Sequence, residues 1–499
     1  MDIDTRRDIK DEYDCIVVGA GPAGLSSATT VMSNGAKDVL IIERDNAPGG
    51  ILLQCIHTGF GLLEFNEELT GPEYAGRWLK SAVEAGVRIL TETIVLSVGE
   101  CADDYWDEGK RYKEVTISGL HTGIRRLKAK TVILAMGCRE RTRGALGIPG
   151  TRPAGILTAG CAQRLVNIEG YMPGRKVLIL GSGDIGLIMA RRMTLEGADV
   201  VAVCEKMPKP GGLERNVQQC LVDFRIPLKL SCTITNIFGK KRVEAAEIAY
   251  FDENGDMKED SREIIECDTI LLSVGLIPEN ELSLQAGLVM DRRTGGPLLG
   301  EGLHTSAQGV FACGNVYKVY DLVDNVSLDS VVIGKKAAAY ISGGEYKGNL
   351  RPEIGNDDEE FELVPGDGSR IMTCTVCPAG CRIKAAKDTE GNWSFEGYTC
   401  RRGLDFARSE VIDPVRVLTS TVLMRTVDSE AMIPVRTVRP IPLAVMSVAM
   451  DEIRRSVIDH VPIQGEIVID DLAGTGIGLK VTGVSRDKFG IGKGYNEQG

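Results

Sequence analysis

The chain has 499 residues, of which 43% are hydrophobic and 26% charged, and its formal net charge is −12. This composition is typical of a globular protein, and the length predicts several domains because a single core stops growing at roughly 250–300 residues. The acidic balance argues against nucleic acid or an anionic membrane as the main partner, and no apolar stretch reaches the roughly 18–20 residues that span a bilayer. With no signal-peptide pattern at its start, the chain is expected to be cytoplasmic.

The first predicted element is an apolar strand at 15–18 that breaks into a Gly-x-Gly-x-x-Gly turn and continues as a helix. In such a turn the first glycine permits the bend, the second lets the backbone approach a pyrophosphate, and the third lets helix pack on strand. The helix N-terminus then offers free N–H groups to the phosphates. An acid ends the next apolar strand, 19 residues after the last glycine, where a ribose diol would be bound. The residues of this first copy are Gly19, Gly21, Pro22, Ala23, Gly24 and Glu43.

A second copy of this pattern begins 162 residues after the first. It again consists of an apolar strand, three spaced glycines, a helical pattern and an acid 19 residues further on. Two complete fingerprints predict that the chain binds two dinucleotides. The residues of the second copy are Gly181, Gly183, Asp184, Ile185, Gly186 and Glu205.

Each fingerprint is followed by an apolar strand that ends in a small residue and a glycine. These strands lie at 131–137, with Ala135 and Gly137, and at 269–275, with Gly275. A third strand at 309–315 ends in Gly314 and Asn315 and precedes a helix at about 329–341. Glycines at strand ends let a connection pass close to a bound nucleotide.

The alternation of strands and helices predicts an α/β fold with two Rossmann-like dinucleotide-binding domains, one inserted in the other. The first domain is expected at 1–150 and 277–345, and the second at 151–276. Residues 346–370 have the composition of a linker. A small α+β cysteine domain is expected at 371–499, with a helix that buries Met446, Met450, Ile453 and Val457.

Four cysteines open this last domain with the spacing C-x2-C-x3-C, followed by a fourth after eighteen residues. In a reducing compartment such a density of thiols predicts a metal site rather than disulfides. Structural zinc usually adds a second close pair of ligands, which is missing here. Three clustered thiolates and one distant thiolate favour a 4Fe–4S cluster, with zinc as the alternative. The predicted ligands are Cys374, Cys377, Cys381 and Cys400.

The first two thirds of the chain resembles the two-dinucleotide-domain flavoproteins of the pyridine-nucleotide-disulfide-reductase superfamily. The resemblance implies that the first fingerprint binds FAD, together with Glu43, Arg44, the pair Gly49–Gly50, and the segment that ends in Gly314 and Asn315. An aspartate usually stands where this chain has Asn315. The second fingerprint would then bind NAD, because Glu205 suits a free 2′-hydroxyl, although the neighbouring Lys206 leaves NADP open.

The segment 49–61 and Cys138-Arg139-Glu140-Arg141 resemble the branch with opine-oxidase and sarcosine-oxidase subunits, and more closely the flavoproteins that accompany an anaerobic-type glycerol-3-phosphate dehydrogenase. Cys55 and His57 would lie near the flavin and are the candidate catalytic residues. The last third resembles a small cysteine domain found beside or fused to such flavoproteins. Its segments Cys400-Arg401-Arg402-Gly403 and Asp413-Pro414-Val415-Arg416 also resemble the 4Fe–4S segment of molybdopterin oxidoreductases.

The resemblance implies an FAD-dependent NAD(P)H oxidoreductase that passes electrons between NAD(H), FAD and an iron–sulfur cluster. The expected partner is a dehydrogenase subunit that oxidises glycerol 3-phosphate or another hydroxy or amino acid, in an oligomer or hetero-complex. One alternative is a self-contained NADH oxidase or peroxidase that uses Cys55, with a structural zinc domain. Another is a scaffold with a vestigial nucleotide fold.

Overall fold

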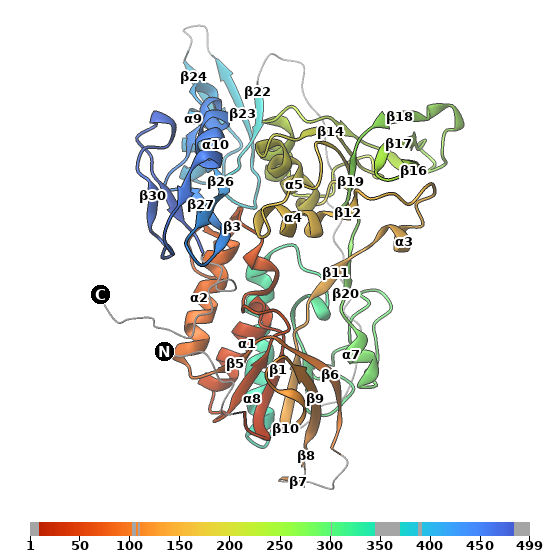
Figure 1. Ribbon diagram of the computed structural model, residues 1–499, viewed down its shortest axis with the longest axis vertical. Helices are drawn as coiled ribbons and strands as arrows, with labels where there is room; N and C mark the ends of the chain where they lie inside the picture. The colour runs from red at the N-terminus through yellow and green to blue at the C-terminus, as the bar shows by residue number, and fades with distance from the viewer. Residues whose placement is uncertain are drawn as a thin grey trace.

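The structure is a computed structural model that describes residues 9–101, 106–107, 110–300, 302–344, 370–387 and 392–483. The expected linker at 346–370 lies outside the described residues, except for Arg370. The chain forms three parts, named here the first domain, which is built from two separate segments, the second domain, which lies between those segments in sequence, and the C-terminal domain (Figure 1).

The first domain is built on a seven-stranded sheet in the order β5-β2-β1-β10-β9-β6, with β21 beside β10. The strands β5, β2, β1, β10 and β21 are parallel, whereas β9 and β6 form an antiparallel extension. The register aligns Val18 with both Ile42 and Leu134, so the carboxyl ends of the three central strands lie side by side. The strands are β1 (Glu12–Val18), β2 (Val39–Ile42), β5 (Arg88–Leu90), β6 (Thr93–Glu100), β9 (Lys113–Gly119), β10 (Gly123–Leu134) and β21 (Val310–Ala312).

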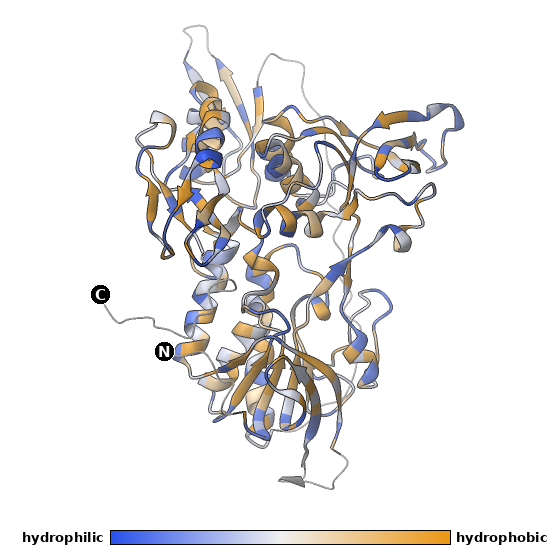
Figure 2. Ribbon diagram, in the orientation of Figure 1, coloured by the Kyte–Doolittle hydropathy of each residue, from blue (hydrophilic) through white to orange (hydrophobic). Residues whose placement is uncertain are grey.

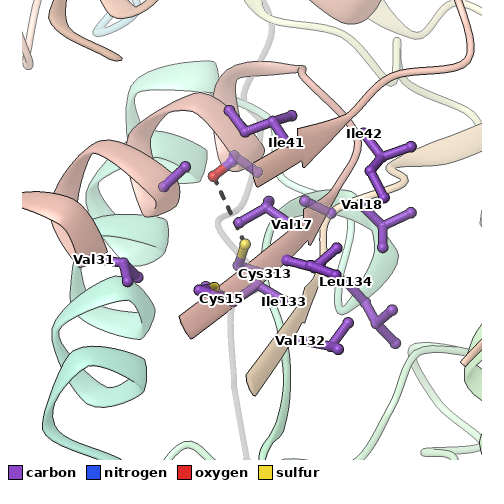
Figure 3. Close-up of a cluster of buried hydrophobic side chains, with 14 of the residues drawn as sticks. Cys15, Val17, Val18, Val31, Ile41, Ile42, Val132, Ile133, Leu134 and Cys313 are labelled. Carbon is purple, nitrogen blue, oxygen red and sulfur yellow. Dashed lines mark hydrogen bonds between the residues drawn. The ribbon is translucent and has the colours of Figure 1, made fainter. Parts of the chain in front are cut away.

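The central strands of this sheet are apolar where helices cover them, which is the whole of β2 and the carboxyl ends of β1 and β10, at 15–18 and 132–134. Figure 2 shows these strands mostly in the hydrophobic colour, and Figure 3 shows Val17, Ile133 and Cys313 among the side chains packed between them. Helices α1 (Pro22–Ser33) and α8 (Val323–Ile341) cross closely, since a Cβ on Gly334 would lie 2.7 Å from the Ser27 oxygen. Helix α2 (Gly71–Glu84) packs beside α1 and begins with a capping box from Thr70 and Glu73.

The second domain contains a fully parallel sheet in the order β12-β19-β13-β14-β15. Helices α4 (Ala159–Asn167) and α5 (Asp184–Leu195) pack on it, and an antiparallel sheet of β16, β17 and β18 lies beside it (Figure 1). The strands are β12 (Ile156–Thr158), β13 (Lys176–Leu180), β14 (Asp199–Cys204), β15 (Leu228–Lys229), β16 (Cys232–Gly239), β17 (Val243–Tyr250), β18 (Glu263–Glu266) and β19 (Thr269–Leu272).

Two antiparallel strands, β11 (Cys138–Glu140) and β20 (Leu276–Pro278), connect the first and second domains. All strands of the second domain lie between them in sequence, whereas β21 and α8 return to the first domain afterwards. The predicted fold class, two dinucleotide-binding domains plus a small C-terminal domain, is therefore confirmed. The exact boundaries at residues 150 and 276 stay predictions.

The C-terminal domain combines a sheet in the order β29-β26-β27-β31-β30 with a smaller sheet β22-β23-β24. Helix α10 ends at Arg455 and buries Met446, Met450 and Ile453 as expected. The inclusion of Val457 on this face was wrong, because Val457 lies in β29 and its side chain is 51% exposed. The elements are β22 (Arg370–Thr373), β23 (Arg382–Lys387), β24 (Trp393–Glu396), α9 (Arg401–Ile412), β26 (Thr419–Arg425), β27 (Glu430–Thr437), α10 (Met446–Arg455), β29 (Val457–Ile458), β30 (Ile467–Ile469) and β31 (Leu479–Val481).

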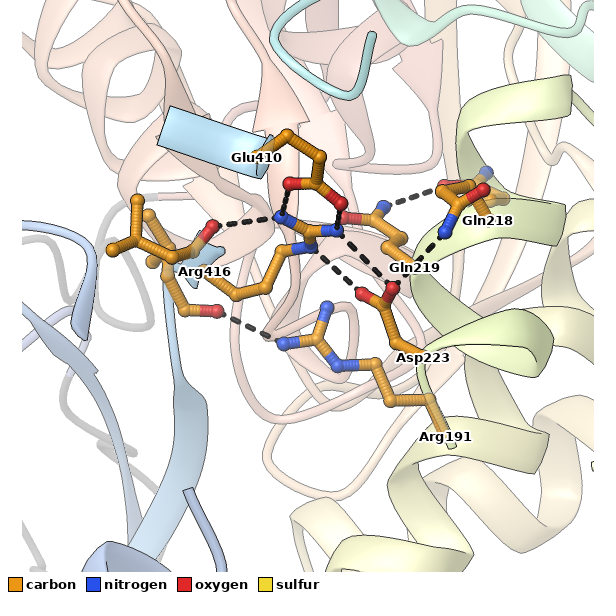
Figure 4. A network of polar contacts seen from close by, with 9 residues as sticks. Arg191, Gln218, Gln219, Asp223, Glu410 and Arg416 are labelled. Atoms are coloured by element: carbon orange, nitrogen blue, oxygen red, sulfur yellow. Dashed lines mark hydrogen bonds and ion pairs between the residues drawn. The ribbon is translucent and has the colours of Figure 1, made fainter. Parts of the chain in front are cut away.

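A buried ion network attaches the C-terminal domain to the second domain (Figure 4). The Arg416 guanidinium donates to both Glu410 oxygens at 2.7 and 2.8 Å and to both Asp223 oxygens at 2.7 and 3.1 Å. On the side of the first domain, Lys480 pairs with Glu73 at 3.0 Å. The C-terminal domain thus contacts both nucleotide-binding domains. No helix in the described part of the chain is both long and apolar enough to cross a membrane.

Candidate functional site

The first glycine turn forms an open cradle at the N-terminus of α1. Gly19 has φ +104°, and a Cβ there would lie 2.6 Å from the Ala135 oxygen, so strand β10 ends directly against the turn. A Cβ on Gly24 would collide with the Gly19 oxygen, which explains the close packing of helix on strand. At Gly21, by contrast, no atom lies within 4 Å of an added Cβ. With Pro22 in its first turn and no side-chain cap, α1 presents its N–H groups to this open space.

The second turn repeats this geometry at the N-terminus of α5. Gly181 has φ +100°, and a Cβ there would collide with the Ser273 oxygen at the end of β19. A Cβ on Gly186 would collide with the Gly181 oxygen, whereas the atoms nearest to a Cβ on Gly183 would be 4.0 Å away. The two predicted fingerprints therefore form two matching cradles, each closed on the protein side and open where a pyrophosphate would lie.

The acids Glu43 and Glu205 occupy the same place in the two copies. Both side chains are buried. Each carboxylate accepts one hydrogen bond from the N–H of the residue that follows the first glycine of its turn, and another from the N–H of the residue two positions after the acid itself. A carboxylate has about four acceptor positions, so both keep capacity for a ribose hydroxyl. Burial raises the pKa of Glu43, which the two N–H donors partly oppose. The donors are Ala20 (2.7 Å) and Asp45 (2.9 Å) for Glu43, and Ser182 (2.9 Å) and Met207 (2.9 Å) for Glu205.

Two glycine pairs lie over the two cradles, and only the first of them was expected. A Cβ on Gly50 would lie 2.9 Å from the Gly21 Cα, and the Gly49 N–H donates to the Ala20 oxygen at 2.8 Å. In the second copy, the Gly211 N–H donates to the Ser182 hydroxyl at 2.8 Å. Sequence reasoning missed the pair Gly211–Gly212, although Pro-Gly-Gly at 210–212 repeats Pro-Gly-Gly at 48–50 with the same offset of 162 as the fingerprints.

The remaining predicted nucleotide residues surround these cradles. Gly137 and Gly275 both have positive φ, +74° and +73°, at the start of β11 and β20 respectively. Gly314 packs on Ala23 of α1, with a hypothetical Cβ 2.6 Å from the Ala23 Cβ. The Asn315 amide accepts from the Tyr320 N–H at 3.2 Å and donates to the Cys138 sulfur at 3.5 Å.

Three other residues that the sequence predicted for nucleotide binding have different surroundings. Arg44 is exposed beside Glu43. Asp184 accepts from the Leu213 N–H and the Asn216 side chain, both at 2.8 Å, so its carboxylate fixes the loop that follows the second glycine pair. Ile185 packs on the core of the second domain.

The segment with Cys55 and His57 lies between the first and second domains. The Gln54 side chain donates to the Gly160 oxygen of α4 at 2.9 Å, and Gln163 accepts a weak contact from the Cys55 sulfur at 3.7 Å. Burial raises the pKa of Cys55 to about 12, so its thiol is protonated at neutral pH. The His57 and Phe60 rings lie tilted at 42° to each other with centroids 4.8 Å apart, and burial lowers the pKa of His57 to about 4.

The four predicted metal ligands lie close to one another at the start of the C-terminal domain. The Cys374 N–H donates to the Cys381 oxygen at 2.9 Å, and Cys400 caps the N-terminus of α9. Burial raises the pKa of Cys374, and the other three thiols add to this rise. N–H groups of α9 lower the pKa of Cys400.

The arrangement of these thiols, however, is not that of a closed ligand set. Within the described ranges, no group of three or more His, Cys, Asp or Glu side chains is placed to hold a metal ion. The donor chemistry suits a cluster, but the four sulfurs would have to move together to bind one. The metal site stays a prediction.

Comparison with known proteins identifies two regions. Residues 13–329 match the family model described as pyridine nucleotide-disulphide oxidoreductase. Residues 401–482 match DUF1667, a family described as proteins of unknown function. This second match begins one residue after Cys400 and therefore does not include the four cysteines.

The chain is similar to an opine oxidase subunit of Agrobacterium tumefaciens, with 25% identity over 334 residues and 63% of each chain covered. It is 26% identical to a thioredoxin reductase of Listeria monocytogenes, over 68% of this chain and 97% of that protein. It is 27% identical to the alpha subunit of sarcosine oxidase from Rhizobium meliloti, over 55% of this chain and 25% of that protein. The chain thus spans only part of the two oxidase subunits.

Solved structures show the same fold. The thioredoxin reductase of T. acidophilum aligns with a TM-score of 0.53 and 23% identity, over 67% of this chain and 99% of that one. That of Lactococcus lactis aligns with a TM-score of 0.54 and 20% identity, over 66% and 99%.

Proposed function

The chain belongs to the pyridine nucleotide-disulphide oxidoreductase family, and on that premise we propose that it transfers electrons between NAD(H), FAD and a 4Fe–4S cluster for a partner dehydrogenase. Family membership makes it an FAD- and NAD(P)-dependent oxidoreductase. The observation that carries the proposal is the duplicated cradle. Two open glycine turns, each with its own buried acid and glycine pair, belong to two domains joined by β11 and β20.

The residues of the first cradle suit FAD. The N–H groups at the start of α1 would bind its pyrophosphate, and Glu43 would accept from its ribose. Asn315 is held by Tyr320 and Cys138 and offers an amide where a carboxylate is usual in the family. An amide still exchanges hydrogen bonds with hydroxyl groups, so a ribityl chain is compatible with this position.

The residues of the second cradle suit NAD better than NADP. The buried Glu205 carboxylate would accept from the 2′-hydroxyl of NAD and repel the 2′-phosphate of NADP. When bound together, flavin and nicotinamide supply two-electron hydride chemistry. The protein binds and orients the two cofactors, and it holds neutral Cys55 and His57 between its domains.

The protonated Cys55 thiol disfavours the alternative function, an NADH oxidase or peroxidase that uses Cys55 as its nucleophile. A thiol reacts as the thiolate, and burial raises the pKa of Cys55 to about 12, which disfavours the thiolate at neutral pH. Since the chain also lacks a Cys-x-x-Cys pair within 13–329, dithiol exchange is not proposed.

A hetero-complex is proposed from the relatives, because the opine oxidase and sarcosine oxidase chains are subunits by name. The four-cysteine loop lies beside the second cradle, since a Cβ on Gly380 would lie 3.7 Å from the Glu214 Cβ. This neighbourhood supports a role for the loop in electron transfer.

The test of the cluster is the iron and acid-labile sulfide content of anaerobically purified protein, with EPR after addition of NADH. About four irons per chain and a reduced-cluster signal are expected. Zinc without iron would contradict the cluster and leave only the flavin and nicotinamide part of the proposal. A Cys377→Ser variant should lose iron but keep its FAD, whereas Cys161→Ser, at an exposed cysteine of the second domain, should keep both.

A further inference from the structure

Arg215 is a buried cation between the first two domains. It belongs to the short helix α6 (Glu214–Val217), which follows the glycine pair Gly211–Gly212. Asp184 anchors this segment through the Leu213 N–H. The Arg215 guanidinium reaches the first domain, where its Cζ and Nη1 lie 3.1 Å from the place of a Cβ on Gly59.

Gly59 provides the space for this guanidinium. It lies in β3 (Thr58–Phe60) and has φ +114°, and a side chain there would force the Arg215 guanidinium to shift. Figure 1 shows β3 at the end of the first domain that faces the other two. The site is therefore built from both nucleotide-binding domains.

The polar surroundings of Arg215 differ from those of the other buried arginines. The residue is only 7% exposed, its Nε is buried without a hydrogen-bond partner, and no carboxylate among the described residues forms an ion pair with it. Other buried arginines of the chain are paired: Arg192 with Glu196 at 2.5 Å and Arg416 with Asp223 at 2.7 Å. Because a buried unpaired charge is costly, an anion is expected at such a position.

His57 lies two residues before Gly59 on the first domain, and burial, with a further contribution from the Arg215 charge, lowers the pKa of its ring to about 4. Its Nδ1 lies 3.2 Å from the Thr58 oxygen. If Nδ1 carries the proton and donates to this oxygen, Nε2 is an acceptor. A guanidinium fork beside a neutral imidazole can bind a two-oxygen anion and accept one hydrogen bond from the same ligand.

We infer that Arg215 is the receptor for an oxyanion, a phosphate or carboxylate group, bound between the two nucleotide-binding domains with His57 beside it. The anion has two possible sources: the pyrophosphate of the nicotinamide dinucleotide, or a separate organic anion. The inference concerns binding alone and holds whether or not the four cysteines carry a cluster.

The test compares the flavin-loaded full chain with its Arg215→Gln and Arg215→Lys variants and an Arg126→Gln control. Arg126 is also a cation, but its side chain is 75% exposed on β10. Calorimetric titration uses inorganic phosphate, acetate and NAD⁺ at constant ionic strength, and melting temperature is recorded without added oxyanion.

For Arg215→Gln we expect at least tenfold weaker binding of one of the three probes, together with a higher melting temperature in the absence of oxyanion, because an unpaired buried charge is removed. Weaker NAD⁺ binding alone assigns the anion to the dinucleotide, and weaker phosphate or acetate binding assigns it to a separate ligand. Arg215→Lys should show the same loss to a smaller degree, and it replaces the glutamine variant if that variant does not fold. Binding of all three probes within twofold of the wild type, as for Arg126→Gln, would overturn the inference.

Discussion

Replacing Glu205 by glutamine should weaken the binding of NAD selectively. The Glu205 carboxylate is 9% exposed and accepts hydrogen bonds from the Ser182 N–H, the Ser182 hydroxyl and the Met207 N–H at 2.6–2.9 Å. A glutamine keeps one acceptor oxygen, so it cannot satisfy these donors and a ribose hydroxyl together.

The expected size of the effect follows from the loss of one hydrogen bond to a charged acceptor, about 1.5–3 kcal/mol. At about 1.4 kcal/mol per factor of ten, the Kd for NAD⁺ should rise about 10- to 150-fold. The Kd for NADP⁺ should rise less or fall, because the repulsion of the 2′-phosphate is also removed.

The duplicated geometry provides the control for this experiment. Glu43→Gln changes the equivalent buried acid of the first cradle, with the same pattern of N–H donors. It should weaken the retention of FAD and leave the NAD⁺ affinity of flavin-loaded protein within twofold. Calorimetric titration of both variants with NAD⁺ measures this difference. Equal effects of the two substitutions on NAD⁺ binding would refute the assignment of the two cradles.

Three further predictions concern other parts of the chain. Arg416→Met leaves two buried carboxylates unpaired, so the free energy of unfolding should fall by about 3–5 kcal/mol. The control Arg425→Met, at an exposed ion pair, should change the free energy of unfolding by less than about 1 kcal/mol. Equal denaturation midpoints of the two variants would contradict this prediction. Because folding lowers the pKa of His57 from 6.5 to about 4, the stability of the wild type should fall as the pH drops through this range. The stability of His57→Asn should fall less over the same range. Parallel pH–stability curves would show that His57 does not contribute. Cys55→Ser should keep NADH turnover with artificial acceptors within twofold, and a loss above tenfold would restore Cys55 as a reacting group.

The two cradles could be predicted from the sequence because their signals are local. A glycine that must adopt positive φ, such as Gly19, and an acid at a fixed distance, such as Glu43, are set by a single strand–turn–helix unit. Gly211 and Gly212 could also have been predicted from the sequence, because Pro-Gly-Gly repeats with the same offset as the two fingerprints.

The interdomain features could not be predicted in this way. The environment of Arg215 depends on Gly59, which is 156 residues distant in sequence, and Arg416 reaches an aspartate 193 residues away. Such contacts depend on how domains pack, which residue spacing does not encode. The cysteine pattern was visible in the sequence, but spacing alone does not bring four sulfurs around one centre.

The proposed function requires that a reduced nicotinamide and a flavin meet within one chain. The decisive measurement is the visible spectrum of the purified protein under anaerobic conditions before and after NADH is added. We predict a yellow protein with one FAD per chain whose flavin absorbance bleaches within the mixing time or shortly after. A colourless protein, or a flavin spectrum that NADH leaves unchanged, would contradict the account.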